Sequence, residues 1–177
     1  MRWFAVSLRR PPRARIGHYL PDLVYGANDG IITTFAVVSG VVGADLSRTI
    51  ILILGFANLF ADGISMGASN YLARRSHEDA AERASRTEAL RHASATLVAF
   101  VLAGVIPLIA YLLPLSSDGS FVAALALTGC ALFGVGAARS LVTGLGWFRS
   151  GVEMLLVGSL AALAAYFIGA LAAAVTD

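Results

Sequence analysis

The chain has 177 residues, of which 58% are apolar and only 14% are charged, and its mean hydropathy is +0.77. A soluble domain of this length needs far more charge to cover its surface, so the composition excludes a soluble protein and indicates an integral membrane protein. The single cysteine also excludes an intrachain disulfide.

Residues 1–17 are predicted to form a basic tail on the cytoplasmic side of the membrane. They carry five arginines, but no long apolar stretch or cleavage site of the kind found in a secretory signal. Because the cytoplasmic leaflet of a membrane is anionic, we expect this tail to lie on its surface.

Five later segments are apolar enough and long enough to cross a bilayer, which takes about 20 residues for each helix. The five predicted spans are about 21–43, 49–73, 93–114, 120–143 and 151–175. We therefore predict an all-α integral membrane fold. Its five-helix membrane domain covers 18–177, and a short charged linker over 74–92 joins the second and third spans.

Arginine placement orients these spans. Twelve of the 13 basic residues lie in the tail, in the 74–92 linker or beside the linker between the fourth and fifth spans, and only Arg48 lies on the opposite side. Because arginines concentrate on the cytoplasmic side, we predict a cytoplasmic N-terminus and a C-terminus outside. We expect a multi-pass protein of the cell (inner or plasma) membrane.

An aspartate interrupts the first span, where Asp29 follows Asn28 in YGANDGIITTFAVVSGV (25–41). A charged residue in a span costs at least about 2.5–3.5 kcal/mol on insertion scales, so a favourable contact has to offset that cost. Residues three, four and seven positions apart share a helix face. The first two spans each carry such a polar stripe: Asp22, Gly26, Asp29 and Thr33 in one, and Asn58, Asp62, Met66 and Asn70, flanked by Ser65 and Ser69, in the other. Because polar groups in lipid must face protein or water, we expect the stripes to face each other or a shared cavity.

The depths of the two stripes also agree. Asp29 lies about eight residues, or roughly 12 Å, inside the cytoplasmic end of the first span, and Met66 lies about seven residues, or roughly 11 Å, inside that of the second. Since these spans run antiparallel, both side chains reach the same level. Asp62 lies one turn deeper, Asn58 another turn beyond, and Asp22 lies at the mouth.

This ligand chemistry favours a divalent transition metal. A carboxylate is a hard ligand and a thioether is a soft one, so the combination favours Fe²⁺ or Mn²⁺ over Mg²⁺ or Ca²⁺. One Asp29 and one Met66 are too few for a site, but a two-fold dimer would double them. The spacings Gly26-x-x-x-Gly30 and Gly63-x-x-x-Gly67 would let helix backbones approach closely in such a dimer.

Other charged residues offer weaker candidates for cytoplasmic metal or proton entrance. In the 74–92 linker, the residues at i,i+4 spacing are Glu78 with Glu82 and Glu88 with His92. Such pairs hold metals, but the interleaved arginines favour a solvated, salt-bridged helical extension. Glu153 lies four residues after Arg149, which favours an ion pair at the membrane surface, with a proton-carrying carboxylate as the alternative. His18 shows no partner in the sequence, and Pro107 predicts a kink in the third span.

Two motifs carry a resemblance to a known family. YGANDGIITTFAVVSGV (25–41) and ILGFANLFADGISMGASNYLARRS (53–76) closely resemble the vacuolar iron transporter family, which includes nodulin-like members, and RHASATLVAFVLAGVIPLIAYLLP (91–114) resembles its third span. The resemblance implies a homodimer that exports Fe²⁺, and often Mn²⁺, from the cytosol in exchange for protons. It implies a pathway between protomers, with Asp29 as the in-membrane aspartate and Met66 as the thioether ligand.

The chain departs from this family in two places. Some members have a glutamate where this chain has Asn58, and Asp62, one turn away, is the residue here that could replace that carboxylate. Many members carry a cytoplasmic metal-binding domain of several Glu-rich helices between the second and third spans, where this chain has only about twenty residues. The chain therefore resembles a variant that lacks this domain.

We thus expect a divalent-metal/proton antiporter whose metal ligands are Asp29, Met66 and Asp62. The residues expected to line its pathway are Asp22, Asn28, Thr33, Asn58, Ser65 and Asn70. One alternative is a non-transporting membrane protein whose stripes form a polar clasp between helices, and another is a small-molecule or cation exporter of a different kind.

The expected partners are divalent metal ions, protons, the lipid bilayer and a second copy of the chain. We expect no cofactor, since the metal is the substrate, and no nucleic-acid partner. The sequence shows no Ser-His-Asp arrangement, phosphate-binding loop, CxxC pair or dinucleotide motif, so we expect no enzymatic activity.

Overall fold

The computed structural model describes residues 12–80 and 86–176, with the side chains of all of these except 12–17, 77–80 and 142. Its elements are α1 (Pro12–Gly43), α2 (Arg48–Ala80), α3 (Arg86–Gly104), α4 (Ile106–Leu112), α5 (Ser117–Thr143) and α6 (Trp147–Thr176). The predicted all-α fold is therefore confirmed in the part of the chain that the structure describes.

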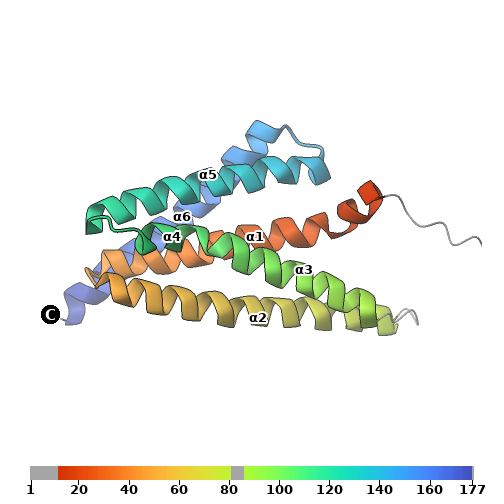
Figure 1. Cartoon of the computed structure of the whole chain (residues 1–177), viewed down its shortest axis with the longest axis horizontal. Coiled ribbons are helices and arrows are strands. Elements are labelled where there is room, and N and C mark those ends of the chain that lie inside the picture. Colours follow the sequence, from red (N-terminus) through yellow and green to blue (C-terminus); the bar gives the residue numbers. More distant parts are fainter. Residues whose placement is uncertain (1–11, 81–85, 177) are drawn as a thin grey trace, which may run out of the picture.

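The helices lie along one common axis, and the start of α1 and the C-terminus lie at opposite ends of it (Figure 1). Four stretches are long and apolar enough to cross a membrane: Arg48–Ser76, Arg86–Leu112, Ser117–Leu141 and Trp147–Thr176. α1 is not among them, because polar residues such as Asn28 and Asp29 lower its mean hydropathy. The five-span topology and the orientation of the termini stay predictions.

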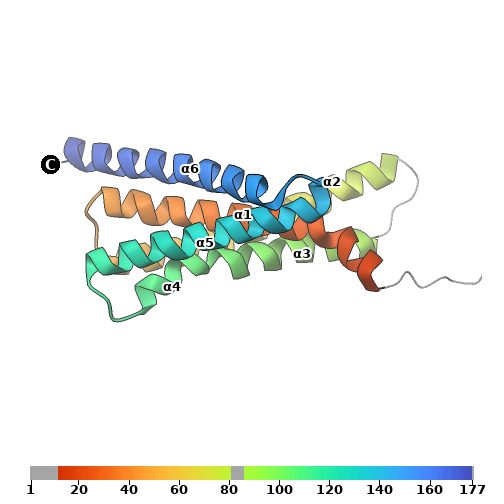
Figure 2. The ribbon, with the colours of Figure 1, turned by 90° about the horizontal axis from the view of Figure 1, so that it is seen from above.

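α1 is the central helix of the bundle, and this position explains how it can carry polar residues such as Asn28 and Asp29. It contacts each of the other five helices, and Figure 2 shows it between α6 and α3. A helix surrounded by protein exposes little of its surface to lipid, so polar side chains on it can find protein partners.

The first three helices extend beyond the predicted spans at the end of the bundle where α1 and α3 begin. α1 begins at Pro12 and continues through Pro21, so part of the predicted 1–17 tail is helical. α2 continues to Ala80 and α3 begins at Arg86, so most of the predicted linker is also helical. Residues 1–11 and 81–85, with Glu82 among them, lie outside the described residues.

The third predicted span is broken in two. α3 ends at Gly104 and α4 begins at Ile106, with Pro107 in the first turn of α4. Proline is tolerated in a first helical turn because its missing N–H would have no helical acceptor there. The predicted kink is therefore a break between two helices. After α4, the Arg48 guanidinium donates to the carbonyl oxygens of Tyr111 and Leu113, each at 2.6 Å, and ties the start of α2 to this turn.

The glycines of α1 bring it against the backbone of α3. A Cβ at Gly26 would collide with the carbonyl oxygen of Thr96, and a Cβ at Gly30 with that of Phe100. Both contacts lie within one chain, so the Gly26-x-x-x-Gly30 spacing serves the packing of α1 on α3 and does not support the close dimer approach for which we invoked it.

The glycines of α2 also face α3. A Cβ at Gly63 would lie 3.3 Å from the Leu97 side chain, and one at Gly67 would lie 3.2 Å from the Cβ of Leu97. The second glycine pair is therefore used within the chain as well. The interaction that small residues allow here is between helices of one bundle, which is their usual role in membrane proteins.

The bundle has one apolar core between α1, α2, α3, α4 and α5. Phe35, Leu59, Phe100 and Leu108 are at most 4% exposed and lie at its centre. Large apolar side chains on the outer faces of the helices, such as Phe60 and Ile64 on α2, are exposed, as expected for a surface that meets lipid.

Candidate functional site

Two carboxylates from different helices meet inside the bundle. Asp29 on α1 and Asp62 on α2 are both half-buried, and they lie close enough for the charge of Asp62 to act on Asp29. In the described part of the chain, neither side chain forms a hydrogen bond or an ion pair. Such a pair of like charges is an arrangement that a cation would stabilise.

The other predicted residues of the α2 stripe differ in exposure. Met66 is half-buried and packs against the apolar core, and Asn58 is half-buried too. Ser65 and Ser69 are exposed on the outer face of the bundle. Met66 therefore packs in the chain as a core residue, and its role as a ligand stays a prediction.

Asn28 and Thr33 lie beside Asp29 on α1. The amide oxygen of Asn28 is buried, and among the described residues it has no hydrogen-bond partner. The hydroxyl of Thr33 donates to the backbone carbonyl of Asp29 at 2.8 Å. Thr33 thus bonds its own helix, while Asn28 keeps a free acceptor next to the carboxylate.

A second polar cluster surrounds Asp22, nearer the start of α1. Asp22 is 6% exposed. Its oxygens accept hydrogen bonds from the Asn70 amide at 2.9 Å and from the Arg74 guanidinium at 3.0 and 3.2 Å. Asn70 also donates to the hydroxyl of Thr96 at 2.6 Å. The structure thus brings Asp22 and Asn70 together, as their stripes predicted, but all of these groups are engaged with protein.

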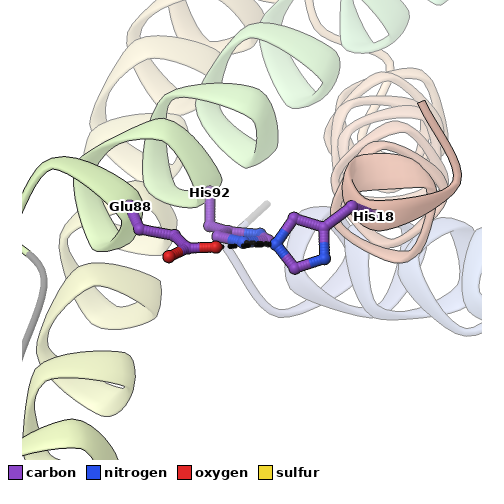
Figure 3. A group of neighbouring side chains, drawn as sticks. All are labelled: His18, Glu88 and His92. Carbon is purple, nitrogen blue, oxygen red and sulfur yellow. Dashed lines mark hydrogen bonds and ion pairs between the residues drawn. The ribbon is translucent and has the colours of Figure 1, made fainter. Parts of the chain in front are cut away.

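His92 joins this cluster from α3. Its Nδ1 lies 2.6 Å from an oxygen of Asp22, and its Nε2 lies 3.1 Å from Nε2 of His18. Nε2 of His18 lies in turn 3.0 Å from Oε1 of Glu88. Figure 3 shows the three side chains His18, Glu88 and His92 pointing toward one another, His18 from α1 and the other two from α3.

These contacts correct two expectations. His18, which shows no partner in the sequence, contacts both Glu88 and His92. His92 is 1% exposed, so it does not belong to a solvated helical extension, although Glu88 is exposed. The reason is the rotation of α3, which turns His92 inward against α1. The side chains of Glu78 and Glu82 lie outside the described residues.

Glu153 forms the ion pair expected with Arg149, at 3.1 Å, and a second one with Arg139 of α5, at 3.4 Å. Its side chain is 38% exposed. The pair with Arg139 links α5 to α6, and the position of Glu153 between two arginines favours the structural role over proton carriage.

Sequence reasoning missed Arg74 and Thr96 as members of the Asp22 cluster, and His18 as a partner of His92. A signal was present in the spacing. His18 and Asp22 are i,i+4 on α1, and Glu88 and His92 are i,i+4 on α3. Two such polar pairs at the same end of two helices are able to face each other if the helices are neighbours.

Comparison with known proteins places this geometry in context. A model of the VIT family matches residues 20–90 and 80–170. The chain is similar to a protein named vacuolar iron transporter from Toxoplasma gondii, with 44% identity over 70 residues, which are 40% of this chain and 23% of the relative. It is similar to one of the same name from Plasmodium falciparum, with 48% identity over 60 residues, which are 34% of this chain and 22% of the relative. The match thus covers less than a quarter of the length of either relative.

A longer match is with vacuolar iron transporter 1 of Arabidopsis thaliana, at 27% identity over 211 positions, covering 85% of this chain and 84% of the relative. Because the 211 aligned positions exceed the 177 residues of this chain, the plant protein has residues inside the alignment without a counterpart here. All three relatives are named as transporters.

The expected location in the cell or plasma membrane is wrong. The relatives are named vacuolar transporters, which points to an intracellular vacuolar membrane. The physical reason for the error is that arginine placement reports which side of a membrane faces the cytosol and carries no information on which membrane it is.

Proposed function

The chain belongs to the VIT family, as its motifs predicted, and we propose that it moves a divalent transition metal, Fe²⁺ or Mn²⁺, out of the cytosol in exchange for protons. The names of its relatives support iron as the substrate. The ligand chemistry supports manganese as a second substrate. By the same names, we infer an intracellular membrane of vacuolar type.

The observation that carries this proposal is the Asp29–Asp62 pair. Two carboxylates from α1 and α2 lie within electrostatic reach of each other, on helices that make up the membrane bundle. A divalent cation between them would neutralise both charges. Met66, one turn along α2 from Asp62, supplies the sulfur that favours a transition metal.

Proton exchange follows from the same chemistry. Protons that arrive from the side opposite the cytosol would neutralise the carboxylates of Asp29 and Asp62, and a protonated carboxyl binds a cation far more weakly. The metal would then leave toward the side that supplied the protons. In this mechanism the two aspartates carry either one metal ion or protons, but not both.

A homodimer would complete the site with a second set of ligands. Support comes from the outer face of α2, where Ser65 and Ser69 are exposed among large apolar side chains such as Phe60 and Ile64. Because polar groups in lipid must face protein or water, a second copy is a fitting cover for this face.

The test is metal flux in liposomes that hold the purified chain, with Fe²⁺ and Mn²⁺ as substrates and an imposed pH gradient. We expect the gradient to speed uptake, and Asp29→Asn, Asp62→Asn and Met66→Leu each to slow it at least about tenfold. The matched control is Asp118→Asn, the same chemical change at an exposed site on α5. Wild-type flux through Asp29→Asn would refute the proposal.

The Asp22 cluster favours one second candidate, a non-transporting protein whose polar residues hold helices together. Its bonds to Asn70, Arg74 and His92 join α1, α2 and α3, as such a clasp requires. This candidate predicts no metal flux through the wild-type chain in the same liposomes, so one experiment separates the two functions.

A further inference from the structure

We propose that His18, Glu88 and His92 form a second metal site, which binds a divalent transition metal at the end of the bundle where α1 and α3 begin. That the site delivers metal to the Asp29–Asp62 pair rests on the proposed function above. Metal binding by these three side chains rests on their geometry alone.

Two of the three separations between the ligand atoms already match those that a shared metal imposes. Nε2 of His18 lies 3.0 Å from Oε1 of Glu88 and 3.1 Å from Nε2 of His92, and all three atoms lie within 4.8 Å of one another. Metal–nitrogen and metal–oxygen bonds of about 2.0–2.2 Å place neighbouring ligand atoms about 3 Å apart. Figure 3 shows the three groups converging on one point between α1 and α3.

One proton satisfies the two short contacts of His18 only in part. An imidazole nitrogen carries either a hydrogen or a lone pair. A hydrogen on Nε2 of His18 would point to the Glu88 oxygen or to Nε2 of His92, or be shared between them in a weaker three-centre bond. A cation at the centre of the cluster satisfies both contacts, because it takes a lone pair from each of the three atoms.

Asp22 orients His92 for this role. An ionised carboxylate only accepts hydrogen bonds, so Nδ1 of His92, 2.6 Å from Asp22, carries a proton, and in the neutral ring the lone pair is then on Nε2. Metal-binding histidines commonly donate their second nitrogen to a carboxylate, which fixes the tautomer and the ring orientation. Asn70 and Arg74 hold Asp22 in turn, so the ring is fixed by a buried network.

The ligand set and its exposure define the substrate class. Two imidazoles and one carboxylate suit Fe²⁺, Co²⁺ or Zn²⁺, whereas Mg²⁺ and Ca²⁺ prefer oxygen ligands. The side chains of His18 and Glu88 are 39% and 51% exposed, so an ion from water can reach the site, and water can complete its coordination. Since His18 lies eleven residues before Asp29 on α1, the site lies about 16 Å along the helix from the Asp29–Asp62 pair.

Direct binding is the first test. The purified full-length chain in detergent is titrated with Co²⁺, and the visible absorption of the bound ion reports nitrogen ligation. We expect His18→Ala and, as a second variant at an exposed residue, Glu88→Gln to weaken Co²⁺ binding at least about tenfold. The control Ser94→Ala changes an exposed neutral residue of α3 and should bind as wild type. Unchanged affinity in both His18→Ala and Glu88→Gln would overturn the site.

Uptake kinetics are the second test. In liposomes we expect His18→Ala and Glu88→Gln to raise the KM for Fe²⁺ at least about tenfold while the maximal rate is kept, and an unchanged KM would overturn the delivery role. The double variant Asp29→Asn/Met66→Leu separates the two proposals. It should lose flux but keep the Co²⁺ absorption, and if it keeps both, the proposed pathway fails while the metal site stands.

Discussion

Replacing Asp22 by asparagine tests how much the buried polar cluster stabilises the bundle. The side chain keeps its shape but loses its charge, and the amide turns an N–H₂ group toward donors. The contact with His92 is the most sheltered, since the two side chains are 7% and 2% exposed. A hydrogen bond to a charged group contributes about 1.5–3 kcal/mol.

The contact with Arg74 contributes less. The Arg74 side chain is 36% exposed and is able to turn toward water, so its pairing with Asp22 is worth about 0–1 kcal/mol. We therefore expect Asp22→Asn to lower the free energy of unfolding by about 1.5–4 kcal/mol. For a chain of this size, that loss corresponds to a fall in Tm of about 3–16 °C.

The assay heats the purified chain in detergent and measures the fraction that still elutes as a monodisperse peak in size-exclusion chromatography. The matched control is Glu153→Gln, the equivalent change at a carboxylate whose side chain is 38% exposed. There we expect the free energy of unfolding to fall by less than about 1 kcal/mol. If the two variants lose heat resistance equally, the argument that burial strengthens the Asp22 cluster is wrong.

Three further predictions concern packing and assembly. Gly30→Ala places a methyl group against the carbonyl of Phe100, so we expect it to lower the free energy of unfolding by about 1–3 kcal/mol, measured in the same heating assay. The control Gly134→Ala has open space around the new methyl group and should keep the stability of the wild type. Arg48→Gln removes two bonds to carbonyls after α4 and should increase proteolysis of that turn; equal digestion of the wild type would contradict this. Ser65→Cys, in a chain with its native cysteine replaced, should form a disulfide-linked dimer in membranes under mild oxidation, and a monomer at all oxidant levels would count against the dimer.

The sequence predicted the helices and the polar faces of α1 and α2, because both follow from local patterns. Apolar length identifies a helix that can lie in lipid, and the four-residue spacing of Asn58, Asp62 and Met66 places them on one face. The pairing of Asp22 with Asn70 also follows from depth, since the two helices run antiparallel.

The role of α3 could not be predicted in this way. His92 meets His18 across 74 positions of the chain, and this contact depends on how α3 is rotated about its own axis. Gly26 and Gly30 of α1 admit the α3 backbone at close range. The glycine spacing indicated a close helix neighbour without indicating which one, and we assigned it to a second copy of the chain.

The glycine contacts also divide the bundle into parts of unequal stiffness. α1 meets α3 and α6 backbone to backbone, at Gly30 and Gly43 respectively, whereas α2 rests on α3 mainly through side chains such as Leu97. Side chains can change rotamer as one helix slides past another, but touching backbones cannot yield without separating. We therefore expect α1, α3 and α6 to move as one rigid body, and any shift of α2 against it to be smallest at the Asp22 cluster, where Asn70 and Arg74 tie α2 to α1.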